Sequence, residues 1–186
     1  MLSDDVNKIL KYAKSLIGIP YTWWLEGENT CSTLHPFYIN KIPTLKYLKE
    51  YGINCTGLIN LLRLKMGKDV KGVGKYKGGT YQWYKYFKDN NFLKEFKYNK
   101  KYPLGTLFIR KYRNIKDQGH VAVLYKWNEK KELKDETLHA YIIHAISNEE
   151  YPINNGKVFV TNLGYTHFST SYGYFDNIVL PEDWLR

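Results

Sequence analysis

A chain of 186 residues can build one domain with a substantial core, and it is too short for two ordinary domains. Its hydrophobic fraction of 44% and aromatic fraction of 17% exclude wholesale disorder, and it contains no run of about 18 apolar residues that could cross a membrane. The net charge of +10 would suit a polyanion, but the lysines are scattered and form no long basic block, which argues against nucleic acid as the partner.

The first residues carry no signal for export. Met1-Leu2-Ser3-Asp4-Asp5 opens the chain with acidic residues and contains neither a basic n-region nor a hydrophobic secretory segment. We therefore expect a cytoplasmic protein, or one carried in a virion or effector particle if it is of viral origin. In a reducing compartment the two cysteines, Cys31 and Cys55, are expected to be free thiols.

The first predicted element is an amphipathic helix that ends at Gly18. Its N-cap would be Ser3 or Asp5, because both side chains can accept a hydrogen bond from the first free backbone N–H groups. Apolar residues at helical spacing form the buried face. They are Val6, Ile9, Leu10, Ala13, Leu16 and Ile17.

An irregular stretch follows this helix. Residues 19–24 are expected to run extended because a proline at the second position disfavours helix in the residue before it. Residues 25–51 are interpreted as an ordered insertion with one short helix at Leu45 to Lys49. Cys31 and His35 lie inside it, but a metal site would need a second pair of ligands at suitable spacing, and the sequence has none. We therefore predict no metal.

Cys55 stands at the start of a strongly patterned helix. Leu, Ile and Met recur at helical spacing within residues 54–67, with Asn54 as the expected N-cap and Gly67 as the expected stop. A cysteine in the first turn of a helix feels unpaired backbone N–H groups and the positive end of the helix dipole, and both favour the thiolate that attacks carbonyl carbons. Cys55 is therefore a candidate nucleophile. The alternative is a small buried apolar residue, which is the commonest fate of a free cysteine.

The second half of the chain predicts a further helix followed by strands. A Gly- and Lys-rich surface loop at 68–79 leads to an amphipathic helix that Thr80 would cap, and a charged connection at 128–136 separates two strands. Strands are expected within residues 103–110, 119–125, 138–146, 157–161 and 178–180. Helices lead and strands follow. This order predicts an α+β fold with N-terminal helices packed on a central antiparallel sheet, in a single domain that spans residues 1–186.

A cysteine nucleophile needs an imidazole base and a third polar group that orients the imidazole. His120 opens an apolar strand directly after a glycine turn, a position expected at the edge of a cleft. His144 lies in the next strand, and an antiparallel hairpin would place it beside His120. Alternation gives His144 an inward face, so it is either the third group or a satisfied core histidine. His139 and His167 are expected to be exposed to solvent.

Five short motifs, taken in order, resemble the NlpC-type cell-wall peptidases, which are small papain-like cysteine hydrolases. The motifs are Gly18-Ile19-Pro20-Tyr21, Asn54-Cys55-Thr56-Gly57-Leu58, Pro103-Leu104-Gly105-Thr106-Leu107-Phe108, Gly119-His120-Val121-Ala122-Val123 and Ile143-His144-Ala145. The resemblance implies a papain-like fold of the unpermuted, peptidase-like branch. It assigns Cys55 as nucleophile, His120 as general base and later acid, and His144 as the orienting group. It also makes Tyr21 a hydrogen-bonding residue beside the nucleophile.

Two departures from the family pattern concern the substrate. The usual Asp-Cys-Ser core is Asn54-Cys55-Thr56 here, so the carboxylate that some members use to recognise a free peptide amine is missing. The usual paired glycines after the tyrosine motif are replaced by Thr22-Trp23-Trp24, whose indoles offer flat apolar surface. We therefore expect a peptide or peptidoglycan-like substrate that needs no free amine. The expected substrate-binding residues are Tyr21, Asn54, Thr56, Trp23 and Trp24. The resemblance implies no metal and no cofactor.

Two functions from other classes remain open. One is a catalytically inactive binding module that keeps the papain fold and uses an aromatic-rich cleft around Trp23, Trp24 and Trp83. The other is a basic structural protein that associates with nucleic acid. An abnormally reactive thiol would separate the hydrolase from both. The sequence leaves the scissile bond and the oligomeric state open.

Overall fold

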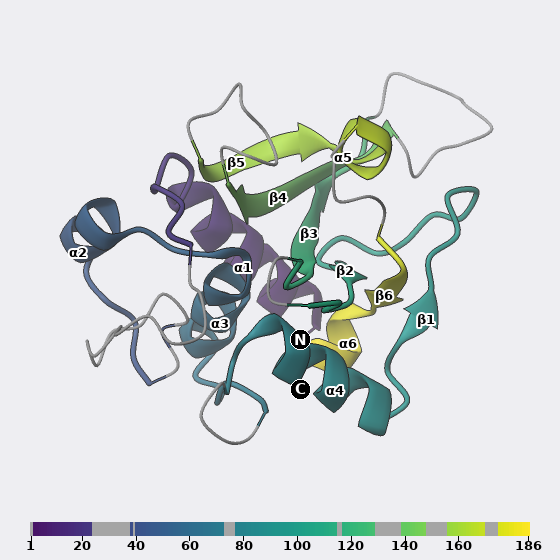
Figure 1. Ribbon diagram of the computed structural model, residues 1–186, viewed down its shortest axis with the longest axis horizontal. Helices are drawn as coiled ribbons and strands as arrows, with labels where there is room; N and C mark the ends of the chain where they lie inside the picture. The colour runs from purple at the N-terminus through teal and green to yellow at the C-terminus, as the bar shows by residue number, and fades with distance from the viewer. Residues whose placement is uncertain are drawn as a thin grey trace.

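In the described part of the chain four helices come before the first strand, and two more helices follow later strands (Figure 1). The computed structural model describes residues 2–23, 38, 40–72, 77–114, 117–128, 139–147, 156–169 and 175–186. In chain order the elements are α1 (Leu2–Ser15), α2 (Leu45–Tyr51), α3 (Cys55–Lys65), α4 (Thr80–Asp89), β1 (Lys94–Glu95), β2 (Leu107–Arg110), β3 (His120–Lys126), β4 (Tyr141–Ile146), β5 (Lys157–Asn162), α5 (Leu163–Ser169), β6 (Asn177–Val179) and α6 (Pro181–Trp184). The predicted α+β class is confirmed. None of the described helices has both the length and the apolar character needed to span a membrane.

One antiparallel sheet of six strands organises the described chain. Its order is β1-β6-β2-β3-β4-β5, so β3 and β4 are neighbours inside the sheet and β5 is an edge strand. Leu124 pairs with Ile142 across β3 and β4. Because side chains alternate along each strand, this register puts His120 and His144 on the same face of the sheet.

The two faces of the sheet carry separate apolar clusters. α1 and α3 contact each other, and α3 also contacts β3 and β4, so these helices cover one face (Figure 1). α3 is buried on all sides from Cys55 to Arg63, as expected for a central helix. The second cluster lies on the face that carries the two histidines. Its buried members are Tyr102, Phe108, Ala122, Leu124, Ala140, Ile142, Leu163, Phe175 and Ile178.

The predicted insertion, residues 25–51, is described only in its last part. Residues 24–37 and 39 lie outside the described residues. The predicted short helix is present as α2, where the Thr44 hydroxyl accepts a hydrogen bond from the Tyr47 N–H at 3.2 Å and Leu48 is wholly buried. α2 leads directly to the strand-like residue Ile53, which pairs with Tyr21.

Three sequence predictions about boundaries and exposure are wrong. α1 begins at Leu2, so neither Ser3 nor Asp5 is its N-cap. α4 takes Gly79 as its N-cap, and Thr80 is already helical. Glycine is an accepted N-cap because it adopts the required extended backbone freely. The loop at 68–79 is not wholly on the surface, since Val70 is 2% exposed and packs in the main core.

The C-terminal residues are tied to the central helix by Arg63. Its guanidinium is buried, donates from Nε to the Asp69 carbonyl oxygen at 2.7 Å and donates from Nη1 to the Trp184 carbonyl oxygen. The Trp184 indole N–H donates in turn to the Gly105 carbonyl oxygen at 2.9 Å. α6 also contacts α1, so the two termini lie on the same side of the molecule (Figure 1).

Candidate active site

Cys55 is the first residue of α3, and its thiol is not part of a disulfide. Asn54 caps the helix as predicted, because its Oδ1 accepts a hydrogen bond from the Gly57 N–H at 2.7 Å. The Thr56 hydroxyl donates to the same oxygen at 3.3 Å. Cys55 is 7% exposed, so a rigid helix terminus holds the thiol with little access to solvent.

A cleft opens at this end of α3. It is lined by Tyr21, Trp23, Asn54, Cys55, Thr56, Thr80, Gln118 and Gly119. The main chain holds Tyr21 in place, since its N–H donates to the Gly156 carbonyl oxygen at 2.7 Å. Trp23 is 39% exposed, and its ring centroid lies 6.4 Å from that of Tyr21. All the predicted substrate-binding residues that the structure describes therefore line the same cleft as Cys55, whereas Trp24 lies outside the described residues.

The two central strands bring His120 and His144 into contact. Nε2 of His120 lies 2.8 Å from Nδ1 of His144, and the two rings meet edge to face. Nε2 of His144 lies 3.0 Å from Oγ1 of Thr161 on β5. His120 directly follows Gly119, which lines the cleft, whereas neither histidine is among the described residues that line it.

Burial keeps both imidazoles neutral. His120 is 5% exposed and His144 is 0% exposed. Burial lowers the pKa of His120 well below its ordinary value of 6.5, and the neighbouring His144 and Arg110 lower it further. Burial also lowers the pKa of His144, to about 3. Near neutral pH both rings are therefore uncharged, which is the state in which a histidine can accept a proton from a thiol.

A glycine makes the turn into β3 possible. Gly119 has φ +83°, and a Cβ added there would lie 2.5 Å from the Arg110 carbonyl oxygen and 2.8 Å from Cγ2 of Thr80. Any other residue would meet both the strained backbone and these contacts. The glycine before His120 is therefore required by the close approach of β2 and α4.

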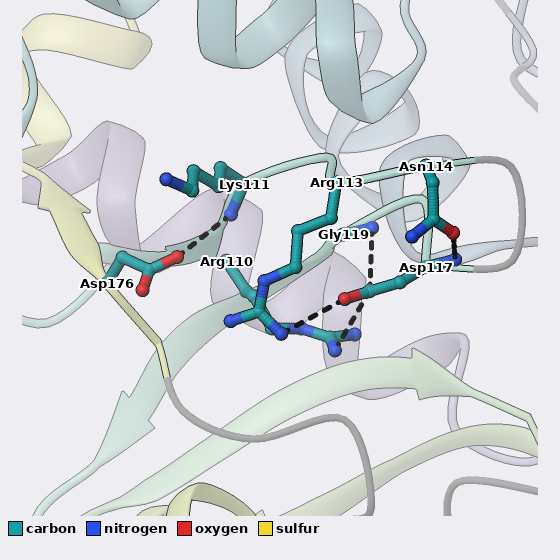
Figure 2. Close-up of polar contacts among 7 residues, drawn as sticks. All are labelled: Arg110, Lys111, Arg113, Asn114, Asp117, Gly119 and Asp176. Atoms are coloured by element: carbon teal, nitrogen blue, oxygen red, sulfur yellow. Dashed lines mark hydrogen bonds and ion pairs between the residues drawn. The ribbon is translucent and has the colours of Figure 1, made fainter.

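One carboxylate holds the loop that leads to His120 (Figure 2). Oδ1 of Asp117 lies 3.0 Å from Nη1 of Arg110, and Oδ2 lies 3.1 Å from Nη1 of Arg113. The Gly119 N–H also donates to Oδ1 of Asp117, at 3.3 Å. The Arg110 and Asp117 side chains are 4% and 11% exposed, so water shields this ion pair little. The ion pair fixes the backbone directly before the first residue of β3.

Two aromatic side chains lie elsewhere than the sequence predicts. His167 is buried rather than exposed, because α5 carries it into the second apolar cluster. There its Nδ1 accepts from the Phe175 N–H at 3.2 Å, and its ring contacts Phe96 edge to face. Trp83 does not line the cleft. It is 2% exposed, and its indole N–H donates to Oδ1 of Asn60 at 2.7 Å.

The remaining residues named in the sequence analysis lie away from the cleft or outside the described residues. Cys31 and His35 lie outside the described residues, and His139 is half-buried rather than exposed. The structure adds Thr80 and Gln118 to the cleft and Thr161 to the histidine pair. Strand alternation could have identified Thr161, because it is a polar residue in the predicted strand that follows the strand of His144.

Comparison with known proteins gives one weak likeness. No family model matches this sequence, and no curated protein matches it. Among solved structures, the chain is similar to a protein from Staphylococcus aureus subsp. aureus Mu50 that is described as similar to lipoprotein, NLP/P60 family. The identity is 15% and the TM-score 0.49, over 95% of this chain and 41% of that chain.

Proposed function

We propose that this protein is a papain-like cysteine hydrolase that cleaves an amide bond in a peptide. Cys55 is the nucleophile, His120 the general base and His144 the group that orients it. The observation that carries the proposal is the hydrogen bond between the two imidazoles, together with a cleft that contains a thiol at a helix start and is lined by Gly119, the residue before His120. A free cysteine, a neutral imidazole and a partner that holds the imidazole are the parts that thiol acyl transfer needs. The five sequence motifs that resemble NlpC-type peptidases support the same roles.

The first half of the reaction forms a thioester. His120 takes the proton from Sγ of Cys55, and the thiolate attacks the carbonyl carbon of the scissile amide. Backbone N–H groups in the first turn of α3 stabilise the oxyanion that develops. His120 then gives its proton to the leaving nitrogen as the C–N bond breaks, and the acyl group stays on Cys55.

The second half releases the acid. His120 takes a proton from water, and the water oxygen attacks the thioester carbon. The C–S bond breaks, the proton returns to sulfur, and a carboxylic acid leaves. His144 remains hydrogen-bonded to His120 throughout and stabilises the imidazolium that forms in each half. Tyr21, which also lines the cleft, hydrogen-bonds the substrate beside the thiol.

The cleft favours a substrate without a free amine at the scissile bond. None of the described residues that line it is acidic, so a substrate ammonium group would meet no carboxylate. The acceptor oxygen of Asn54 already receives the Gly57 N–H. The exposed face of Trp23 offers an apolar contact for a larger peptidyl group. We therefore propose a peptide or peptidoglycan stem peptide, cut within the chain rather than next to a free amino terminus.

Alkylation of the thiols tests the nucleophile. Iodoacetamide labelling of the Cys31→Ala protein reports Cys55, and labelling of the Cys55→Ala protein reports Cys31. We expect fast labelling near neutral pH for Cys55 alone, and slower labelling when His120→Ala is added. Fast labelling of Cys31 would contradict the assignment. Cleavage is then measured on a peptide panel with the Cys55→Ala protein as blank, and an unreactive Cys55 with no cleavage would favour the inactive binding module.

A second function, polyanion binding, is favoured by one surface feature. A groove with a volume of about 410 Å³ lies at the β1 edge of the sheet. Four lysines and one acidic residue contribute to its lining, namely Lys94, Lys97, Lys100, Lys101 and Glu95. Salt-sensitive retention on DNA that is lost in the Lys100→Gln/Lys101→Gln protein would support this function. The matched control is Lys8→Gln/Lys11→Gln on the exposed face of α1, and equal retention by both double variants would exclude the groove.

A further inference from the structure

Gln118 lies in the loop that leads to β3, between two residues whose backbone is fixed. Before it, the Asp117 carbonyl oxygen accepts from the N–H groups of Arg113 and Asn114, at 3.0 and 3.2 Å. The Asp117 N–H donates in turn to Oδ1 of Asn114 at 2.9 Å. After it, Gly119 has no room for a Cβ, because β2 and α4 approach it closely. The backbone on both sides of Gln118 is therefore held in place.

The Asp117 carboxylate closes a turn around Gln118 (Figure 2). Its Oδ1 accepts from the Gly119 N–H at 3.3 Å, so this hydrogen bond spans Gln118 and forms an Asx-turn. The same carboxylate pairs with the guanidinium groups of Arg110 and Arg113. A loop that is already rigid loses little conformational entropy when one of its side chains binds a ligand. Gln118 is therefore well placed to contribute to binding.

Gln118 is half-buried and lines the same cleft as Cys55. The space inside this cleft has a volume of about 30 Å³. That volume has room for about two water molecules, so the residues that line it surround one small space. A substrate group that enters this space to reach the Cys55 thiol therefore meets Gln118.

The described lining of the cleft contains no Asp, Glu, Lys, Arg or His. Two of its polar side chains already serve the cap of α3, because Oδ1 of Asn54 accepts from the Gly57 N–H and from the Thr56 hydroxyl. Gln118 contributes a primary amide, which has two N–H donors and one acceptor oxygen. A peptide group has one donor and one acceptor, so a glutamine amide can satisfy both.

We propose that Gln118 is a substrate-binding residue that recognises an uncharged peptide group of the substrate beside Cys55. Its amide nitrogen donates to the carbonyl oxygen of that group, and its amide oxygen accepts from a peptide N–H. A charged group would lose its hydration in this cleft and meet no opposite charge on the described lining residues, which favours a neutral ligand. The inference rests on the proposed hydrolase function and names the chemical group that the cleft recognises.

Two small alkylating reagents test the recognition. N-methyl-iodoacetamide and methyl iodoacetate transfer their groups to a thiol through the same carbon, and the second has an oxygen where the first has a peptide N–H. Rates of Cys55 labelling are measured on the Cys31→Ala protein, and each is divided by the rate for free N-acetylcysteine. We expect the normalised rate to be about tenfold higher for the amide, because only the amide offers an N–H to Gln118.

Variants of Gln118 test the cause in the same Cys31→Ala background. Gln118→Ala removes the amide, and Gln118→Met removes it while keeping the length of the side chain. Both should bring the ratio of the two normalised rates to about one. The ratio does not respond to a change in thiol reactivity alone, because both reagents react with the same sulfur. The matched control is Gln82→Ala, which removes the other glutamine of the chain, a half-buried residue of α4, and should keep the wild-type ratio.

The outcomes separate this inference from the hydrolase proposal. Equal normalised rates in the protein with Gln118 intact overturn the inference, and so does a preference that both Gln118 variants keep. Loss of the preference in Gln82→Ala also overturns it, because the effect would then reflect general loosening. A preference that depends on Gln118, in a protein that cleaves no peptide, leaves the binding role standing and the hydrolase proposal refuted. A Cys55 that neither reagent alkylates overturns both.

Discussion

Nε2 of His120 lies 2.8 Å from Nδ1 of His144, and both rings are almost closed to solvent. Both are neutral in the folded protein, because burial lowers the pKa of His120 well below 6.5 and that of His144 to about 3. In the unfolded chain each histidine takes up a proton near pH 6.5. The unfolded state therefore binds more protons as the pH falls below that value, and folding stability is lost on the acid side.

The first prediction is a fall in the free energy of unfolding between about pH 6.5 and about pH 5, above the range in which most carboxylates titrate. Each ring that is protonated only in the unfolded chain contributes a slope of about 1.4 kcal/mol per pH unit at the lower end of this window. Urea titrations over the window measure the slope. In the His144→Gln protein one proton fewer is taken up on unfolding, so the slope should be smaller by about 1.4 kcal/mol per pH unit. An unchanged slope in that variant would contradict the conclusion that His144 is neutral in the folded protein.

The second prediction concerns the carboxylate before His120. Asp117→Ala should lower the free energy of unfolding by about 3 kcal/mol, because it leaves the buried Arg110 without its ion-pair partner. Arg113→Ala removes the other arginine from the same carboxylate, but that side chain is 39% exposed, so its loss should cost at most about 1 kcal/mol. Denaturant unfolding of the two variants measures both losses of stability. Equal losses in Asp117→Ala and Arg113→Ala would contradict the prediction.

The third prediction compares two glycines with positive φ. Gly119 and Gly18 have φ values of +83° and +91°, but an added Cβ would lie 2.5 Å from the Arg110 carbonyl oxygen at Gly119 and would meet nothing within 4 Å at Gly18. Gly18→Ala should therefore cost about 1 kcal/mol from backbone strain alone. Gly119→Ala should cost more and should also slow labelling of Cys55, since it displaces the start of β3. Similar effects on stability and labelling at both sites would show that the close approach is unimportant.

Periodicity was enough to predict the elements that carry the proposed chemistry. The apolar spacing after Cys55 and the capping chemistry of Asn54 are local, and the structure has α3 from Cys55 with Asn54 as its cap. Strand alternation and an antiparallel hairpin also predict that His120 and His144 meet, and their ring nitrogens are 2.8 Å apart. These predictions depend on neighbours in sequence or on one strand pair.

The remaining features depend on contacts between distant segments. α5 follows β5 without a breaker between them, and only the fold shows that it carries His167 into an apolar cluster. The burial of Trp83 requires the Asn60 side chain of another helix as its hydrogen-bond partner. The Thr161 and Thr166 hydroxyls meet only because the turn at Asn162 folds α5 back on β5. Local propensity contains no information about such partners.

The last prediction uses Asn54, which both caps α3 and lines the cleft. Asn54→Ala removes the acceptor of the Gly57 N–H and should cost about 1 kcal/mol of stability. Asn54→Asp keeps an acceptor at that place and adds a negative charge that the helix terminus favours, so this protein should be at least as stable as the wild type. The charge also gives the cleft a carboxylate, which none of its described lining residues provides.

If the proposed substrate class is right, this carboxylate should create a preference for a free amine. The measurement is kcat/KM on a matched pair of peptides with free and acetylated amino termini, with the Cys55→Ala protein as blank. The wild-type protein should not prefer the free amine, whereas Asn54→Asp should shift the ratio toward it by about 1–3 kcal/mol, the usual value of a hydrogen-bonded charge in a partly buried site. A wild-type protein that already prefers the free amine strongly would refute the substrate class, because its cleft would then recognise the ammonium group without a carboxylate at position 54.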